Sequence, residues 1–461
     1  MADSQAAPAA PPPGSATYTA PKPPPGNSAL RMLGLPTLPR KLPSRNWMIF
    51  WALTASISGA IIYDRREKRR ATARWAKAVS HLAAEPIPSP SALPRRLTVY
   101  LEAPPGDGLR VAQDHFTEYV KPVLAASGLD WEFVQGRREG DVRAVVAERV
   151  RRARRATEAD IGAGTDAGAQ EQQPPTGDEM VEQWRRKNNI PEYEGVRGDV
   201  VVGRHTWKEY VRGLHEGWLG PLTAPPEPQQ PAEASETKEG ETEKKDEEDK
   251  PKRPPQPKPY NTVESYPTSH LPLLIPSELG PSAPVPFPHI LGFLNTPTRL
   301  RRFLTRRYLA DQIGREVAAV CLCTYREFRE ADSVSTNVDA EWEQQLVLAH
   351  EEKDWVKSVW KEAAADDAKP TTGPGDGEGA APRSDVTERI WAKPVVVDTR
   401  IGMRMRRFEI LPEDEDRARK IVVPEEEIEG WIKGSLRQAW RWGAKKYSGE
   451  EKKQIPLDDE E

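Results

Sequence analysis

An uncharged run of 18 residues, NWMIFWALTASISGAIIY at positions 46–63, constrains this chain more than any other feature. At about 1.5 Å per residue, a helix of this length spans roughly 27 Å, slightly less than the ~30 Å hydrocarbon core of a bilayer. Trp47, Trp51 and Tyr63 lie where aromatic side chains gather at membrane interfaces. The run therefore predicts one transmembrane helix over 46–63. The alternative is a buried helix of a soluble domain.

Small residues recur about every four positions along one face of this expected helix. Where side chains are small, the backbone of a second membrane helix can approach closely. We expect this face to contact a partner helix; the alternative is that small residues are simply common in such segments. The face consists of Ala52, Ser56, Gly59 and Ala60.

The two flanks of the run differ from one another. Residues 1–45 are rich in proline and hold a single acidic residue, Asp3, and this predicts a disordered, basic lead of the kind found in organelle-targeting segments. Residues 64–84 predict a basic amphipathic helix with an apolar stripe that includes Trp75. The second flank is the more basic one, so the positive-inside rule would keep the C-terminal side in the less exported compartment.

The basic residues of the second flank are expected to face anionic lipid head groups, each contributing about 1 kcal/mol near a charged surface. A solvated helix face is the alternative. These residues are Arg65, Arg66, Lys68, Arg69 and Arg70.

The rest of the chain predicts an α/β domain tethered by the membrane helix. Strand-like runs alternate with amphipathic helices, and this alternation implies a parallel or mixed sheet. The expected segments are an α/β region at 95–222, a disordered acidic and proline-rich linker at 223–260, a second α/β part at 261–362, a disordered linker at 363–384, a hairpin and helix at 385–447, and an acidic tail at 448–461.

Several elements of this domain can be predicted individually. Asp107 is expected to cap the helix that starts near position 109. The apolar run at 317–325 is expected to be a buried strand, and 341–362 a helix. The segments PVVVDTR and MRMRRFEI, which begin at 394 and 403, suggest a hairpin.

The chemistry-bearing residues indicate no catalytic, cofactor or metal site. Two thiolates, Cys321 and Cys323, do not complete a tetrahedral zinc site, and no two of the seven histidines have metal-ligand spacing on a helix. The loop PPGDG at 104–108 is the best-placed anion-binding candidate, but the carboxylate of Asp107 opposes an anion. With 67 basic and 71 acidic residues, the chain is nearly neutral, and we expect no nucleic-acid partner.

Several long strings of the chain resemble the fungal Tim fifty-four family, a subunit of the mitochondrial inner-membrane carrier translocase. The strings include ALRMLGLP, LPSRNWMIFW, YDRREKRR, LTVYLEAPPGDGLRVAQDHFTEYVKPVL, LDWEFVQGRREGDVR and GDVVVGRHTWKEYVRGLHEGWLGPL. The resemblance is densest over 29–222 and continues more weakly over 297–325 and 385–447. It includes no catalytic motif.

The resemblance implies a single-pass inner-membrane protein whose C-terminal domain lies in the intermembrane space, against the charge count. The implied partners are the channel subunit of the carrier translocase, the small intermembrane-space chaperones and the i-AAA protease. Two alternatives remain open: a membrane-tethered α/β enzyme that uses the loop at 104–108, and an adaptor for an inner-membrane protease.

Overall fold

The computed structural model describes residues 44–86, 93–162, 177–188, 190, 193, 195–225, 256–330, 341–361, 388–428 and 431–447. Most of the segments expected to be linkers or tails, namely 1–45, 223–260, 363–384 and 448–461, lie outside these ranges. The chain divides into two units, residues 1–59 and 60–461.

The apolar run forms the first part of one long helix, α2 (Arg45–Val79), which the short 3-10 helix η1 (Ser80–Ala84) follows. The large apolar side chains from Trp47 to Tyr63 are exposed, apart from a partly covered Ile61. By length and composition, this is the one helix among the described residues that could cross a membrane. The expected amphipathic helix at 64–84 is therefore the continuation of the apolar helix.

A six-stranded sheet forms the centre of the second unit, in the order β2-β1-β3-β4-β6-β5. All neighbouring strands are parallel except β5 and β6, which are antiparallel, so the sheet is mixed as predicted. Strand β4 lies after the long acidic linker, and the segment beyond that linker therefore completes the sheet. The strands are β1 (Arg96–Glu102), β2 (Asp130–Gly136), β3 (Asp199–Val202), β4 (Ser282–Val285), β5 (Tyr325–Glu327) and β6 (Arg406–Phe408).

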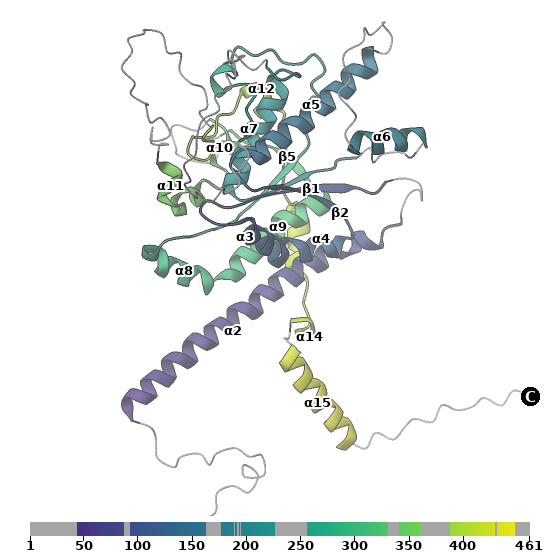
Figure 1. Ribbon diagram of the computed structural model, residues 1–461. Coiled ribbons are helices and arrows are strands. Elements are labelled where there is room, and N and C mark those ends of the chain that lie inside the picture. The colour runs from purple at the N-terminus through teal and green to yellow at the C-terminus, as the bar shows by residue number, and fades with distance from the viewer. Residues whose placement is uncertain are drawn as a thin grey trace, which may run out of the picture. The chain divides into compact units, whose positions relative to one another are not determined.

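Helices cover both faces of this sheet (Figure 1). Alternate residues of β1 point to opposite faces: Leu97, Val99 and Leu101 enter one core, and Tyr100 enters the other. The first core is covered by the end of α2 and by α3 (Leu109–His115), η2 (Phe116–Val120), α4 (Lys121–Ser127), α9 (Arg306–Leu322) and α13 (Pro412–Lys420). The second is covered by α5 (Asp141–Gly162), α7 (Arg204–Leu219), α10 (Glu343–Leu346) and α12 (Thr399–Gly402).

The remaining elements are short or lie outside these two layers. They are α6 (Gly177–Lys187), η3 (Val263–Ser265), η4 (Phe293–Asn295), α8 (Thr296–Phe303), η6 (Ala349–Asp354), α11 (Lys357–Trp360), α14 (Glu425–Ile428) and α15 (Trp431–Tyr447).

The second half of α2 packs into the domain rather than standing free. Trp75 and Val79 are buried in the first core, and Ala71, Ala78 and Leu82 pack against it. The apolar stripe predicted from helical spacing thus contacts protein, not lipid. Trp75 Nε1 donates a hydrogen bond of 2.7 Å to Asp311 Oδ1 of α9.

The prediction of a buried strand at 317–325 was wrong. Residues 317–322 continue α9, and Cys323 ends that helix in a left-handed conformation with φ 59°. Ala310, Ile313, Val317 and Cys321 repeat at helical spacing and are all buried. A short run that is apolar on every side looks the same for a buried strand and a buried helix, and here the helix that leads into the run decides the outcome.

Two further predictions were wrong in the C-terminal half. Residues 341–362 form three separate turns, α10, η6 and α11, instead of one helix. The expected hairpin is absent between 394 and 410: the segment 394–398 pairs with no strand, and α12 follows it. Strand β6 pairs with β4 and β5 instead, so both of its edges are already taken.

Candidate functional site

The carboxyl ends of β1 and β3 are the place where a fold of this order would hold a ligand. In an open sheet with strand order 2-1-3-4, the chain leaves β1 toward one side and β3 toward the other, and ligands bind in the crevice between the two loops. The N-termini of α3 and α7 follow these strand ends and that of α5 follows the neighbouring β2, and helix N-termini attract anions. The enzyme alternative therefore depends on which groups occupy these helix N-termini.

The loop at 104–108 uses its own backbone amides internally. Asp107 N donates to Pro104 O at 3.0 Å, and Gly108 N donates to Asp107 Oδ1 at 3.0 Å. Gly106 has a positive φ of 85°, and its α-carbon faces the side chains of Leu291 and Val356. The N-cap of α3 is Gly108, without a side-chain cap bond, so the prediction of Asp107 as the cap was wrong by one position.

A carboxylate of the chain itself occupies the N-terminus of α7. Glu351 Oε2 accepts a hydrogen bond from Arg204 N at 3.0 Å, and Glu351 Oε1 accepts one from Phe287 N at 2.6 Å. The Glu351 carboxyl is buried, and burial raises its pKa to about 7 even though both amides favour the charged form. The position at which a phosphate would bind is filled.

The N-terminus of α5 is filled in the same way by Glu209 of α7. Its two carboxylate oxygens accept hydrogen bonds from Gly140 N, Val142 N and Arg143 N at 2.6, 3.0 and 3.1 Å. Glu102, the last residue of β1, lies buried beside it. Burial, followed by repulsion from Glu209, raises the pKa of Glu102 well above its usual range. The crevice is therefore acidic and internally bonded, which disfavours phosphate or nucleotide.

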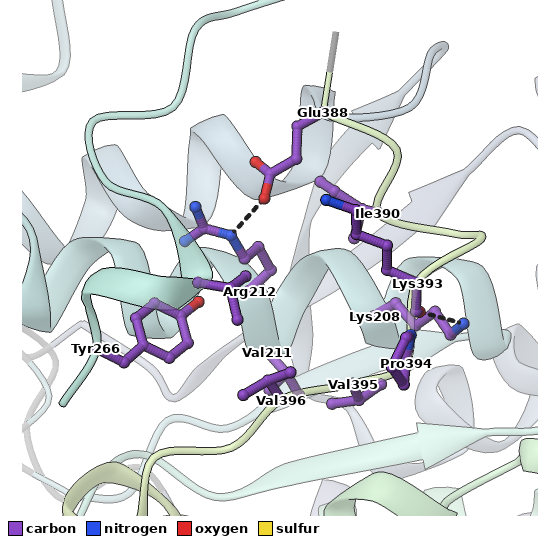
Figure 2. Close-up of a pocket in the computed structure, with 11 residues that line it drawn as sticks. Lys208, Val211, Arg212, Tyr266, Glu388, Ile390, Lys393, Pro394, Val395 and Val396 are labelled. Carbon is purple, nitrogen blue, oxygen red and sulfur yellow. Dashed lines mark hydrogen bonds and ion pairs between the residues drawn. The ribbon is translucent and has the colours of Figure 1, made fainter. Parts of the chain in front are cut away.

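A small cavity lies between α7 and the segment 388–396 (Figure 2). Arg212 Nε donates to Glu388 Oε1 at 2.8 Å, and Lys208 Nζ donates to the carbonyl oxygens of Trp391 and Lys393 at 2.6 and 2.9 Å. The cavity measures about 30 Å³, which is room for a water molecule rather than for an organic substrate. Its charged side chains fasten the C-terminal segment to α7.

A second cavity, of about 230 Å³, lies between β2 and the helical segment α3–η2. Phe116, Trp131 and Phe133 form its aromatic walls, with ring centroids 5.0 Å apart for Phe116 and Phe133. Gln113, Gln135 and Lys121 supply its polar groups. A surface of this kind can hold a small apolar side chain, and its lining residues include no carboxylate, histidine or cysteine.

No metal site is formed among the residues that the structure describes, where no three histidine, cysteine, aspartate or glutamate side chains come together. Cys321 is buried, and burial raises the pKa of its thiol to about 11, which makes it unreactive. Cys323 follows at the end of α9, so the two cysteines do not share a strand face as expected.

The predicted membrane-facing residues all lie on α2. The side chains of Ala52, Ser56 and Ala60 are exposed, and Gly59 has open space around its α-carbon. The small face is thus accessible, and its contact with a partner helix stays a prediction.

Most of the basic flank has partners inside the chain. Arg66 pairs with Glu425 and Lys68 with Glu118. Arg70 pairs with Glu67 at 2.6 Å, and Arg69 Nη1 donates to the carbonyl oxygen of Ile428 at 3.5 Å. Arg65 is exposed.

Sequence reasoning missed the role of Asp64, the first residue after the apolar run. Its buried carboxylate accepts hydrogen bonds from Arg306 N at 3.1 Å and from Arg307 N and Nη1, both at 3.3 Å. Asp64 therefore caps α9, to which it is joined only in three dimensions. The signal in the sequence is an acidic residue at the boundary between the apolar run and the basic flank.

The chain is similar to curated subunits of a mitochondrial protein import complex. A family model described as "Inner membrane protein import complex subunit Tim54" matches residues 27–244 and 229–408. A mitochondrial import inner membrane translocase subunit tim54 of Neurospora crassa is 62% identical over 456 residues, with 95% of this chain and 92% of the relative covered.

Proteins of the same name from other fungi are more distant. The one from Aspergillus oryzae is 42% identical, with 86% of this chain and 91% of the relative covered. The one from Candida albicans is 31% identical, with 83% of this chain and 96% of the relative covered. This chain belongs to the Tim54 family of subunits of the mitochondrial inner-membrane protein import complex.

Proposed function

We propose that the protein is a non-catalytic subunit of the carrier translocase of the mitochondrial inner membrane. It supports assembly of the complex and docks the small intermembrane-space chaperones that deliver multi-spanning proteins. The observation that carries this proposal is the course of α2, whose exposed apolar run leads into a buried segment of an α/β domain. Such a helix connects a partner within the membrane to a domain that binds the small chaperones.

The geometry of the sheet edge favours a binding role over catalysis. Glu351 and Glu209 bond the helix N-termini at which a substrate anion would be activated. Of the two cavities described above, one has room only for water, and the other is walled by aromatic side chains and lined by no carboxylate, histidine or cysteine. The enzyme alternative at 104–108 therefore has little to support it.

We place residues 64–461 in the intermembrane space. The acid-poor lead before Trp47 is of the targeting type, and in mitochondria such a segment can decide sorting against the charge count. The exposed Arg65 and Arg69 are the members of the basic flank with the freest access to anionic lipid, since Arg66, Lys68 and Arg70 have acidic partners in the chain.

A protease-protection experiment tests the orientation. Protease added to mitochondria with ruptured outer membranes should degrade the C-terminal domain, because that domain would face the opened space. If the domain is degraded only after the inner membrane is dissolved, the orientation is the opposite one, as the charge count predicts.

Native purification tests the partners. The full-length protein should co-purify with the channel subunit and the small chaperones. Recovery of an inner-membrane protease in place of the channel subunit would favour the adaptor alternative.

A further inference from the structure

A cluster of exposed apolar side chains lies at η4 and α8. Phe293 and Leu294 of η4 are 89% and 92% exposed, and Leu300 and Phe303 of α8 are exposed as well. We refer to these four residues as the α8 patch. Large apolar side chains on adjoining turns, left open to this extent, mark a surface that meets an apolar environment.

The segment that carries the α8 patch has only positive charges of its own. Residues 291–308 contain five arginines and no acidic residue. Arg302 pairs with Asp354 at 3.1 Å, and Arg307 pairs with Asp64 at 3.3 Å. Arg299 and Arg301 are exposed. Apolar side chains beside arginines form the pattern of a helix that lies in the interface of an anionic bilayer.

The position of α8 relative to the end of the apolar run favours lipid over a protein partner. Asp64 follows directly after that run and bonds the amides of Arg306 and Arg307, three and four residues beyond the end of α8. The guanidinium of Arg307 also lies 5.4 Å from the ring of Tyr63. An eight-residue helix is about 12 Å long, so α8 extends over about that distance from the segment that bonds Asp64, where α2 would leave a membrane, and η4 continues from its far end.

We propose that η4 and α8 bind the surface of the bilayer that α2 spans. Phe293 and Leu294 insert at the boundary of head groups and acyl chains, and Arg299 and Arg301 bind the phosphates of anionic phospholipids. The proposal rests on the membrane span proposed above. It adds a second lipid contact, 230 residues further along the chain, which would hold the domain against the membrane and orient it.

Photo-crosslinking in vesicles tests this. The full-length chain carries a benzoylphenylalanine at Leu294 and is reconstituted into phosphatidylcholine vesicles with or without cardiolipin. The matched control carries the same group at Leu273, which is also almost fully exposed but lies between Leu271 and Ile275, residues that pack on the opposite core. Lipid adducts should form at Leu294, with a higher yield in cardiolipin vesicles, and not at Leu273.

A charge variant tests whether the arginines contribute to the lipid contact or whether Leu294 is merely close to the bilayer. Arg299→Glu with Arg301→Glu should lower the adduct yield at Leu294 by about thirtyfold in cardiolipin vesicles, since two arginines near an anionic surface together contribute about 2 kcal/mol. Arg110→Glu, at an exposed position on α3, should leave the yield unchanged. Both variants change only exposed positions, and the melting temperature of each shows whether it is folded.

The outcomes distinguish this proposal from the one on which it rests. If alkaline carbonate extracts the protein from the vesicles, then α2 does not span the membrane and both proposals fail. If the protein resists carbonate but Leu294 and Leu273 give equal yields, or if the charge variant has no effect, then the span stands and the α8 contact is wrong.

Discussion

Gly314 determines how closely α9 approaches the second half of α2. A β-carbon at this position would lie 2.3 Å from Cδ1 of Trp75, a side chain that is almost fully buried and held by its bond to Asp311. Because the indole has nowhere to move, we expect Gly314→Ala to lower the free energy of unfolding by about 1–3 kcal/mol, the usual cost of overpacking. Thermal unfolding of the full chain in nanodiscs measures it.

Gly434 supplies the matched control for this substitution. It also lies within a helix, α15, but has open space around its α-carbon. Alanine is the better helix former by about 1 kcal/mol, so Gly434→Ala should be neutral or slightly stabilising. Equal effects of the two substitutions would show that the α2–α9 contact is not close-packed.

His215 gives the domain a dependence on acid. Its Nδ1 donates to Val211 O at 2.7 Å and its Nε2 accepts from Asp398 N at 2.9 Å, so the ring is neutral in the folded state. Burial lowers the pKa of His215 to about 4, against about 6.5 for an unfolded histidine. The unfolded chain therefore takes up this proton first, and stability is lost as the pH falls from 6.5 toward 4.

Replacing this side chain should reduce the loss. In His215→Gln the fall in unfolding free energy between pH 6.5 and 4 should be smaller than in the wild type by on the order of 1–3 kcal/mol. His115 and His205, whose pKa values are also lowered to about 4 by burial, account for a further part. Denaturant titrations at several pH values measure this, with the exposed His270→Gln as control. An unchanged pH profile in His215→Gln would contradict it.

At the scale of elements, periodicity succeeded where one face of an element is buried and the other is not. Helix α5 and strand β2 keep exposed residues and were predicted; β1, β3 and α7 were predicted as well, although nearly all of their residues are buried. The run at 317–322 lacks an exposed face, since almost every side chain there is buried. Val395 and Val397 are buried and Val396 between them is exposed, as in a strand. The segment nevertheless pairs with no strand, because pairing depends on neighbouring strands that the local sequence does not specify.

One side chain, Asp64, links two of these elements. Its carboxylate on α2 accepts hydrogen bonds from the first backbone amides of α9. Asp64→Ala removes the acceptor for Arg306 N and Arg307 N and leaves the start of α9 uncapped. We expect a loss of about 0.5–2 kcal/mol and faster amide exchange in the first turn of α9, measured by hydrogen–deuterium exchange. Asp107→Ala is the matched control, since the Asp107 carboxylate accepts from the amide of its neighbour Gly108 and lies 3.7 Å from His289 Nε2 but makes no cap bond to a helix. Similar exchange in both variants would refute the capping role.

At the scale of the whole molecule, the sequence indicated the membrane helix and the α/β class but not how they meet. The decisive contacts join residues that are far apart in the chain: Asp64 with Arg306 and Glu351 with Arg204. No local pattern marks such pairs, because an acidic residue in a helix flank or a loop usually faces water. For the same reason, the sequence does not predict that carboxylates of the chain bond the N-termini of α5 and α7.

The small face of α2 gives the last prediction, which concerns assembly. If Ser56 lies against a partner helix, Ser56→Leu forces the two backbones apart and loses packing, while the segment stays apolar enough to insert. Thr54→Leu adds a similar volume on the other side of the helix, because two residues correspond to a rotation of about 200°. Both side chains are exposed within this chain. Ser56→Leu should therefore reduce co-migration with the channel subunit on native gels, and Thr54→Leu should not. Equal recovery of the complex in both variants would mean that α2 is a passive anchor and that assembly depends on the α/β domain.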